Sequence, residues 1–187
     1  MNKALRYLFW GYFFIFFRIQ IGIDWLADPI GYLLIASGCL QLLQQYPQAK
    51  KARMVAMIGA VISIPAVFVN LSVPNLGMWE SYSVLLFFLK LIIAYFLFTI
   101  LKSIVNDYAN QALIHRTKNV YSFYIAVHLA SLLLMSFSMN MPEYPWLTFV
   151  AALAIGTFIM DIAFLLLLGA IRRAEPHQTA QNHDFFA

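Results

Sequence analysis

The chain has 187 residues, of which 63% are hydrophobic and only 11% carry a charge. Soluble domains are about 45–50% apolar and about 25% charged, so this composition excludes an ordinary soluble globular protein. A membrane span needs about 20 apolar residues, so the length leaves room for about six or seven spans and no separate extramembrane domain. The net charge of +4 does not indicate nucleic-acid binding, because the basic residues stand at the ends of apolar runs, where membrane topology explains them.

Six apolar runs of transmembrane or near-transmembrane length follow one another along the chain. They predict an all-α polytopic membrane protein: a single bundle of six transmembrane helices over residues 1–173, followed by a disordered cytoplasmic tail at 174–187. The first run has the basic start of a signal peptide but no small-residue cleavage site, so we interpret it as an uncleaved span. The predicted spans lie near residues 5–23, 29–45, 54–73, 83–104, 120–139 and 146–170.

The connections between these runs alternate in charge. Residues 46–53 and 106–119 contain several Lys and Arg residues, whereas 24–28, 74–82 and 141–145 contain none. Cytoplasmic loops carry the Lys/Arg excess, so both termini are predicted to lie inside a bacterial cytoplasmic membrane. Ten of the twelve Lys and Arg residues then lie on the cytoplasmic side: Lys3, Arg6, Lys50, Lys51, Arg53, Lys102, Arg116, Lys118, Arg172 and Arg173.

Several short patterns predict local structure. Asp28 precedes a proline, which is typical of a helix start, because a carboxylate caps the first amides and proline suits the first helical position. Gly31 and Gly38 are two turns apart and predict a face on which a second helix can pack closely. Pro65 predicts a kink in the third span. An apolar face over residues 105–113 predicts that the fourth span continues past Lys102 as a helix that projects into the cytoplasm, with an amphipathic helix in the membrane interface as the alternative.

Four ionisable residues interrupt the predicted spans, namely Arg18, Lys90, His128 and Asp161. A charge at the centre of a bilayer costs roughly 2.5–3.5 kcal/mol on insertion scales, so each residue is a candidate for function. Arg18 is expected to reach outward to Asp24 or Asp28, because its guanidinium matches a carboxylate. Lys90 either joins this outer acidic group or reaches the membrane surface alone.

Asp161 is short and must find a partner or be protonated. His128, on the preceding span, is the nearest candidate by depth, and the pair could serve as a proton relay or as a structural hydrogen bond between helices. The sequence contains no zinc-protease, nucleophile-elbow or phosphate-loop motif, so no metal, cofactor or catalytic residue is predicted. An enzyme is therefore not favoured, although an intramembrane enzyme using His128 and Asp161 stays open.

The stretch "DWLADPIGYLLIASGCLQLL" (24–43), with its Asp-Pro-x-Gly-Tyr helix start, resembles uncharacterised small multi-pass membrane proteins of Gram-positive bacteria. This resemblance covers about twenty residues and implies no activity. In size and span count the chain also resembles the substrate-binding subunits of energy-coupling-factor vitamin transporters. Those subunits dock to their partner through alanine-rich small residues on the first helix, whereas this chain has the aromatic run "LFWGYFFIFFRIQIGI".

Three hypotheses about function follow from these observations, with the lipid bilayer and either a small-molecule ligand or another membrane protein as partners. A binding or transport-related protein predicts that Arg18, Asp24, Asp28 and Lys90 converge on a cavity open to the outer side. An assembly or regulatory protein predicts a filled bundle with paired charges. An intramembrane enzyme predicts His128 and Asp161 within hydrogen-bond distance in a cleft that water can reach.

Overall fold

The computed structural model describes residues 1–17, 20–21, 23–24, 28–68, 78–136 and 143–174. Over these residues the chain is helical apart from one antiparallel pair of two-residue strands, which confirms the all-helical part of the predicted fold class. The elements are α1 (Asn2–Phe16), β1 (Gln20–Ile21), β2 (Ile23–Asp24), α2 (Asp28–Leu42), α3 (Ala49–Ile62), the 3₁₀-helix η1 (Ile64–Val67), α4 (Met78–Asp107), α5 (Gln111–Ser136) and α6 (Glu143–Ala174).

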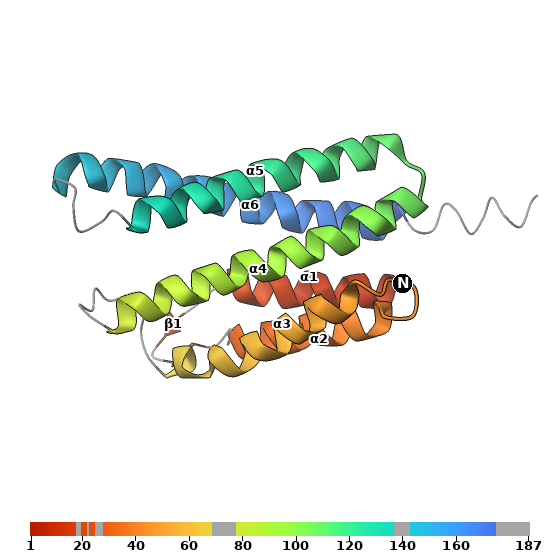
Figure 1. The fold of residues 1–187 in the computed structure, drawn as a ribbon, viewed down its shortest axis with the longest axis horizontal. Helices are drawn as coiled ribbons and strands as arrows, with labels where there is room; N and C mark the ends of the chain where they lie inside the picture. Colours follow the sequence, from red (N-terminus) through yellow and green to blue (C-terminus); the bar gives the residue numbers. More distant parts are fainter. Residues whose placement is uncertain (18–19, 22, 25–27, 69–77, 137–142, 175–187) are drawn as a thin grey trace, which may run out of the picture.

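The helices lie alongside one another in a bundle (Figure 1). Each helix contacts the next along the chain, and α1 also contacts α6, which closes the ring of contacts. In the view of Figure 1, α4 runs through the middle, with α1, α2 and α3 on one side and α5 and α6 on the other. The N-terminus, the α2–α3 and α4–α5 connections and the end of α6 all lie at the same end of the bundle, which we call the basic end.

The core of the bundle is built around α4. Over the second half of this helix, the side chains that face inward are fully buried. They are Ile93, Ala94, Leu97, Phe98, Ile100, Leu101, Ile104 and Val105. At the basic end the hydroxyl of Tyr46 donates a hydrogen bond to Asp107, with 2.7 Å between the oxygens. Burial, together with the Asp107 carboxylate, raises the pKa of Tyr46 well above its ordinary value, so this phenol stays protonated and ties the α2–α3 turn to the end of α4.

Helices α1 and α2 cross with their backbones in direct contact. A Cβ atom added at Gly11 would lie 2.7 Å from the Gly31 carbonyl oxygen, and one added at Gly31 would lie 2.7 Å from the Gly11 carbonyl oxygen. Two turns further along α2, Gly38 packs against Ala4 and Leu8 of α1. Glycine is the residue that allows helices to approach this closely, so the predicted packing face of α2 is present.

Three helices, rather than the six predicted, are long and apolar enough to cross a membrane among the described residues: α4, α5 and α6. Helices α1, α2 and α3 have 15, 15 and 14 residues, which corresponds to about 21–23 Å against about 30 Å of hydrocarbon. The first predicted span extended to residue 23, but α1 ends at Phe16. The stretch "IQIGID" (19–24) alternates β-branched and polar or small side chains, a pattern that favours strands, and within it Gln20–Ile21 and Ile23–Asp24 form the β1–β2 pair.

The third predicted span also ends early. Pro65 does not kink a continuous helix; instead α3 ends at Ile62 and Pro65 lies in the separate 3₁₀-helix η1. Proline lacks the amide hydrogen that a continuing helix would need, which accounts for the break. The hydroxyl of Tyr82 on α4 donates to the Ile62 carbonyl oxygen at 2.7 Å, so the end of α3 has a partner for one of its last carbonyls.

The predicted continuation of α4 through residue 113 is wrong. Helix α4 ends at Asp107, Ala109 has a φ of 51°, and α5 begins at Gln111. The side chain of Asn110 accepts a hydrogen bond from the Leu113 amide at 3.2 Å, which is the geometry of a helix cap. Residues 108–110 therefore form a turn between two antiparallel helices, and the apolar face counted across them belongs to two helices.

Candidate binding site

Asp161 lies at the centre of a cluster of polar side chains from four helices. It stands on α6, and its side chain is only 4% exposed. The ammonium nitrogen of Lys90, on α4, lies 2.5 Å from its Oδ2 atom and donates a hydrogen bond to it. A buried carboxylate needs such a partner, because desolvation of an unpaired charge costs several kcal/mol, on the order of the whole stability of a small domain.

Two tyrosines complete the hydrogen bonding of this carboxylate. Tyr12 on α1 donates to Asp161 Oδ1 at 2.5 Å, and Tyr124 on α5 lies 3.2 Å from the same atom. The two hydroxyl oxygens are 2.6 Å apart. Each hydroxyl has one hydrogen, so when Tyr12 donates to the carboxylate, Tyr124 donates either to Asp161 or to Tyr12. Both tyrosines are fully buried.

His128 is the fifth member of the cluster, one helical turn after Tyr124. Its Nδ1 atom is 2.9 Å from the Tyr124 carbonyl oxygen, and a carbonyl can only accept, so Nδ1 carries a hydrogen. Its Nε2 atom is 3.6 Å from Asp161 Oδ1 and has no hydrogen-bond partner among the described residues. A second proton on the ring at Nε2 would therefore place a positive charge beside the carboxylate.

Aromatic packing holds these groups in place. The His128 ring stacks on two aromatic rings. Its centroid is 3.9 Å from that of Tyr124 and 5.4 Å from that of Phe87. Phe164, one turn after Asp161 on α6, contacts the Tyr12 ring edge-on at 4.5 Å. The rings fix the side chains that face the carboxylate, and offset or edge contacts of this kind add about 0.5–1.5 kcal/mol each.

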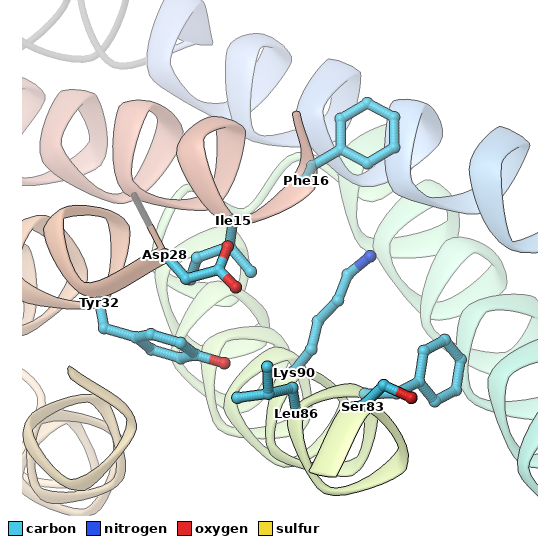
Figure 2. A pocket seen from close by; sticks show the side chains of 8 residues that line it. Ile15, Phe16, Asp28, Tyr32, Ser83, Leu86 and Lys90 are labelled. Atoms are coloured by element: carbon cyan, nitrogen blue, oxygen red, sulfur yellow. The ribbon is translucent and has the colours of Figure 1, made fainter. Parts of the chain in front are cut away.

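A pocket lined by polar and apolar side chains reaches Lys90 (Figure 2). Its volume is about 240 Å³, and it lies between the end of α1 and the starts of α2 and α4. Figure 2 shows Lys90 on one side of it and Asp28 and Tyr32 on the other. The pocket is lined by Ile15, Phe16, Asp28, Tyr32, Ser83, Leu86, Phe87 and Lys90. Ligand pockets are usually about 300–1,000 Å³, so this one suits a very small ligand.

The structure places the predicted site residues in two groups. Lys90 and Asp28, which the sequence assigned to one outer polar site, do line the same pocket. Arg18 and the side chain of Asp24 lie outside the described residues, so their predicted pairing stays a prediction. His128 and Asp161 are close together as predicted. The sequence did not predict that Lys90 pairs with Asp161, which joins the two groups into one connected site.

The two tyrosines of the cluster were missed by sequence reasoning. Tyr12 lies within the aromatic run of the first span and Tyr124 within "YSFY", where both look like ordinary apolar or interfacial rings. A signal was present, because Tyr12 is ten residues after Asn2, or roughly 15 Å into the helix. A phenol hydroxyl at that depth needs a hydrogen-bond partner, and this requirement could have directed attention to it.

Comparison with known proteins adds no assignment: no protein family, curated protein or solved structure matches this chain significantly.

Proposed function

We propose that this chain is a six-span integral protein of a bacterial cytoplasmic membrane, with both termini inside, that binds a small polar ligand in the Lys90 pocket as a transport-related or accessory component. Three helices have the length and composition of membrane spans. The six-span arrangement is further supported by the alternation of basic and non-basic connections, which matches the alternating direction of the helices in Figure 1.

The outer surface of the bundle supports membrane placement of the short helices as well. Every helix exposes large apolar side chains, and many such side chains are expected on lipid-facing or partner-facing surfaces. Among them are Trp10 on α1, Leu33 and Leu40 on α2, Met54 and Val61 on α3, Phe88 on α4, Phe123 and Leu133 on α5, and Phe149 and Ile155 on α6.

The topology is tested with alkaline phosphatase fusions, because the enzyme forms its disulfides only outside the cytoplasm. A fusion after residue 77 is expected to be active, since this connection contains no Lys or Arg, and a fusion after residue 110 is expected to be inactive. Immunoblots of the two fusions control for expression. The reverse pattern of activities would overturn the orientation, and activity at both positions would overturn the number of spans between them.

One observation carries the binding proposal: Lys90 belongs to the buried ion pair and to the pocket at the same time. Its side chain is 15% exposed, whereas that of Asp161 is 4% exposed. A cation at the inner limit of an accessible pocket can exchange a protein carboxylate for an anionic group of a ligand, because the stem of lysine is long and flexible. The ligand class that fits is a small molecule with a carboxylate or comparable anionic oxygen, and Asp28 and Tyr32 on the facing wall suit a second, polar or cationic group.

Release of Lys90 leaves Asp161 with its two tyrosine contacts and without its cation. The groups that then remain beside this carboxylate are the Tyr12 and Tyr124 hydroxyls and His128 Nε2, which is 3.6 Å from Asp161 Oδ1.

Binding is tested by thermal unfolding of the detergent-purified protein with acetate, glycine, alanine, ethylamine and inorganic phosphate. A bound probe at about 100 times its Kd stabilises by about 2.7 kcal/mol. We expect small carboxylates to stabilise the wild-type protein and to have no such effect on Lys90→Gln. The control is Lys102→Gln, which makes the same change on the same helix away from the Lys90 pocket, and this variant is expected to be stabilised like wild type. Equal stabilisation of wild type and Lys90→Gln would contradict the proposal.

Native mass spectrometry of the same sample separates this proposal from the accessory and transporter-subunit alternatives. A retained small molecule that is lost in Lys90→Gln supports ligand binding. A partner chain retained with the protein, and unaffected by Lys90→Gln, would instead favour an assembly role or a subunit similar to those of energy-coupling-factor transporters. The enzyme alternative has no comparable support, because neither His128 nor Asp161 is among the residues that line the pocket.

A further inference from the structure

We infer that the groove between α1 and α6 binds one acyl chain of an anionic phospholipid of the inner leaflet, with its phosphate at Arg172 and Arg173. The groove has a volume of about 440 Å³, which falls within the usual range of ligand pockets of about 300–1,000 Å³. It shares Phe16 with the lining of the Lys90 pocket and is otherwise lined by different residues. Its lining residues are Phe9, Phe13, Phe16, Phe17, Ile162, Leu165, Leu166, Gly169, Arg172 and Arg173.

The distribution of charge along the groove matches such a lipid. Along α6 the apolar lining residues Ile162, Leu165 and Leu166 precede Gly169, and Arg172 and Arg173 follow it at the end of the helix. Arg172 places its guanidinium carbon 5.9 Å from the centroid of the Phe9 ring, and Arg173 Nε donates to the Gly169 carbonyl oxygen at 3.2 Å. These contacts hold both cations beside the mouth of an apolar groove, which is the arrangement that recognises an anionic head group attached to a hydrocarbon chain.

The length of the groove agrees with one leaflet. Arg173 lies eleven residues after Ile162 on α6, which corresponds to roughly 16 Å, and one leaflet is about half of the roughly 30 Å hydrocarbon core. The groove also opens to the outside of the bundle, since Leu166 is 55% exposed and Ile162 is 37% exposed. A lipid can therefore enter sideways from the bilayer.

Gly169 provides room in the wall of the groove. A Cβ atom added there would meet nothing within 4 Å, in contrast to the glycines of α1 and α2, where an added Cβ would collide with the neighbouring helix. Replacement of Gly169 by leucine should fill the groove without displacing either helix. The volume of the groove can thus be changed at Gly169 without changing the charge that Arg172 and Arg173 supply.

The test measures the lipids retained by the full-length protein in native mass spectrometry after extraction from vesicles of phosphatidylcholine with 20 mol% phosphatidylglycerol. Wild type is expected to retain phosphatidylglycerol in preference to phosphatidylcholine. Each arginine near a membrane surface contributes a factor of about five in affinity for anionic lipid, so Arg172→Gln/Arg173→Gln is expected to lose about 25-fold. Gly169→Leu is expected to lose retention of both lipids.

Lys50→Gln/Lys51→Gln is the matched control, because it removes the same charge from exposed residues at the same end of the bundle. It is expected to retain phosphatidylglycerol like wild type. The inference is overturned if this control loses as much lipid as the arginine variant, if wild type retains both lipids equally, or if Gly169→Leu retains lipid like wild type. If Gly169→Leu does not fold, as judged by its melting curve, the two charge variants alone decide.

This inference rests on the proposed placement of the basic end at the cytoplasmic face, but not on ligand binding at Lys90. The two can fail separately. A protein whose melting temperature responds to small carboxylates and that retains no anionic lipid overturns only the groove. A protein that retains phosphatidylglycerol through its arginines while Lys90→Gln changes nothing overturns only the pocket.

Discussion

Lys90→Met is expected to lower the free energy of unfolding by about 3–5 kcal/mol, because it leaves the Asp161 carboxylate buried without its cation. Asp161 is 4% exposed and cannot reach water from its place on α6. Tyr12 and Tyr124 would still donate to it, but two neutral hydrogen bonds do not replace a charge-assisted one. The loss is measured by unfolding of the purified protein in detergent with increasing denaturant or temperature.

Removal of the other partner of the ion pair, in Asp161→Asn, is expected to lower the free energy of unfolding by less than Lys90→Met does. Asp161→Asn leaves Lys90 without its carboxylate, but the lysine side chain is 15% exposed and borders the pocket, so its ammonium can turn to water. The double variant Lys90→Met/Asp161→Asn should be more stable than the sum of the single losses predicts, by about 0.5–3 kcal/mol, since residues in direct contact are coupled. If the loss of stability in the double variant equals the sum of the two single losses, the ion pair does not contribute to stability.

The pH dependence of Lys90→Met provides a second measurement with a definite sign. Without lysine, the folded protein is most stable when Asp161 holds a proton, which the unfolded chain does not hold at neutral pH. The folded state then binds more protons than the unfolded state, so stability falls as the pH rises. Lys90→Met should therefore recover stability between pH 8 and pH 5 relative to wild type. Lys102→Met, which loses only a cation–π contact with Tyr121, should show neither the large loss nor this recovery.

The sequence was sufficient to identify the polar residues of this site but not their partners. Lys90, His128 and Asp161 stand out because charged or ionisable groups in apolar runs are costly. The Lys90–Asp161 pair was missed because depths were counted from the outer end of each predicted span, which put the two residues roughly 12 Å and 22 Å deep. Such counting assumes that all helices are parallel and start at one level. Counted from the basic end, the residues differ by only about 6 Å, which a lysine stem can span.

The sequence predicted that the helices exist more reliably than it predicted where they end, because local features of the sequence set the ends. In a hydrophobicity pattern, the residues after Phe16 and after Ile62 continue to look like membrane spans, because Ile and Val are apolar in strands as well as in helices. Ala109 gave no signal of its left-handed conformation, since alanine rarely adopts one. These boundaries depend on β-propensity, proline and capping rather than on total hydrophobicity.

Gly31→Ala and Gly169→Ala are expected to change stability in opposite directions, although both add one methyl group to a helix. At Gly31 the new Cβ would lie 2.7 Å from the Gly11 carbonyl oxygen, so α1 and α2 would have to separate. Overpacking of this kind costs about 1–3 kcal/mol. At Gly169 there is nothing within 4 Å, and alanine is favoured over glycine inside a helix by about 0.5–1 kcal/mol.

The displacement at Gly31 should also reach the polar cluster, because Tyr12 directly follows Gly11, the residue that Gly31 contacts. A shift of α1 moves the Tyr12 hydroxyl away from Asp161, to which it donates at 2.5 Å, and widens the pocket at Ile15 and Phe16. Gly31→Ala is therefore expected to weaken carboxylate binding as well as stability, whereas Gly169→Ala should leave binding intact. Melting curves with and without acetate measure both effects. Equal behaviour of the two variants would mean that the close contact of α1 and α2 does not position the site.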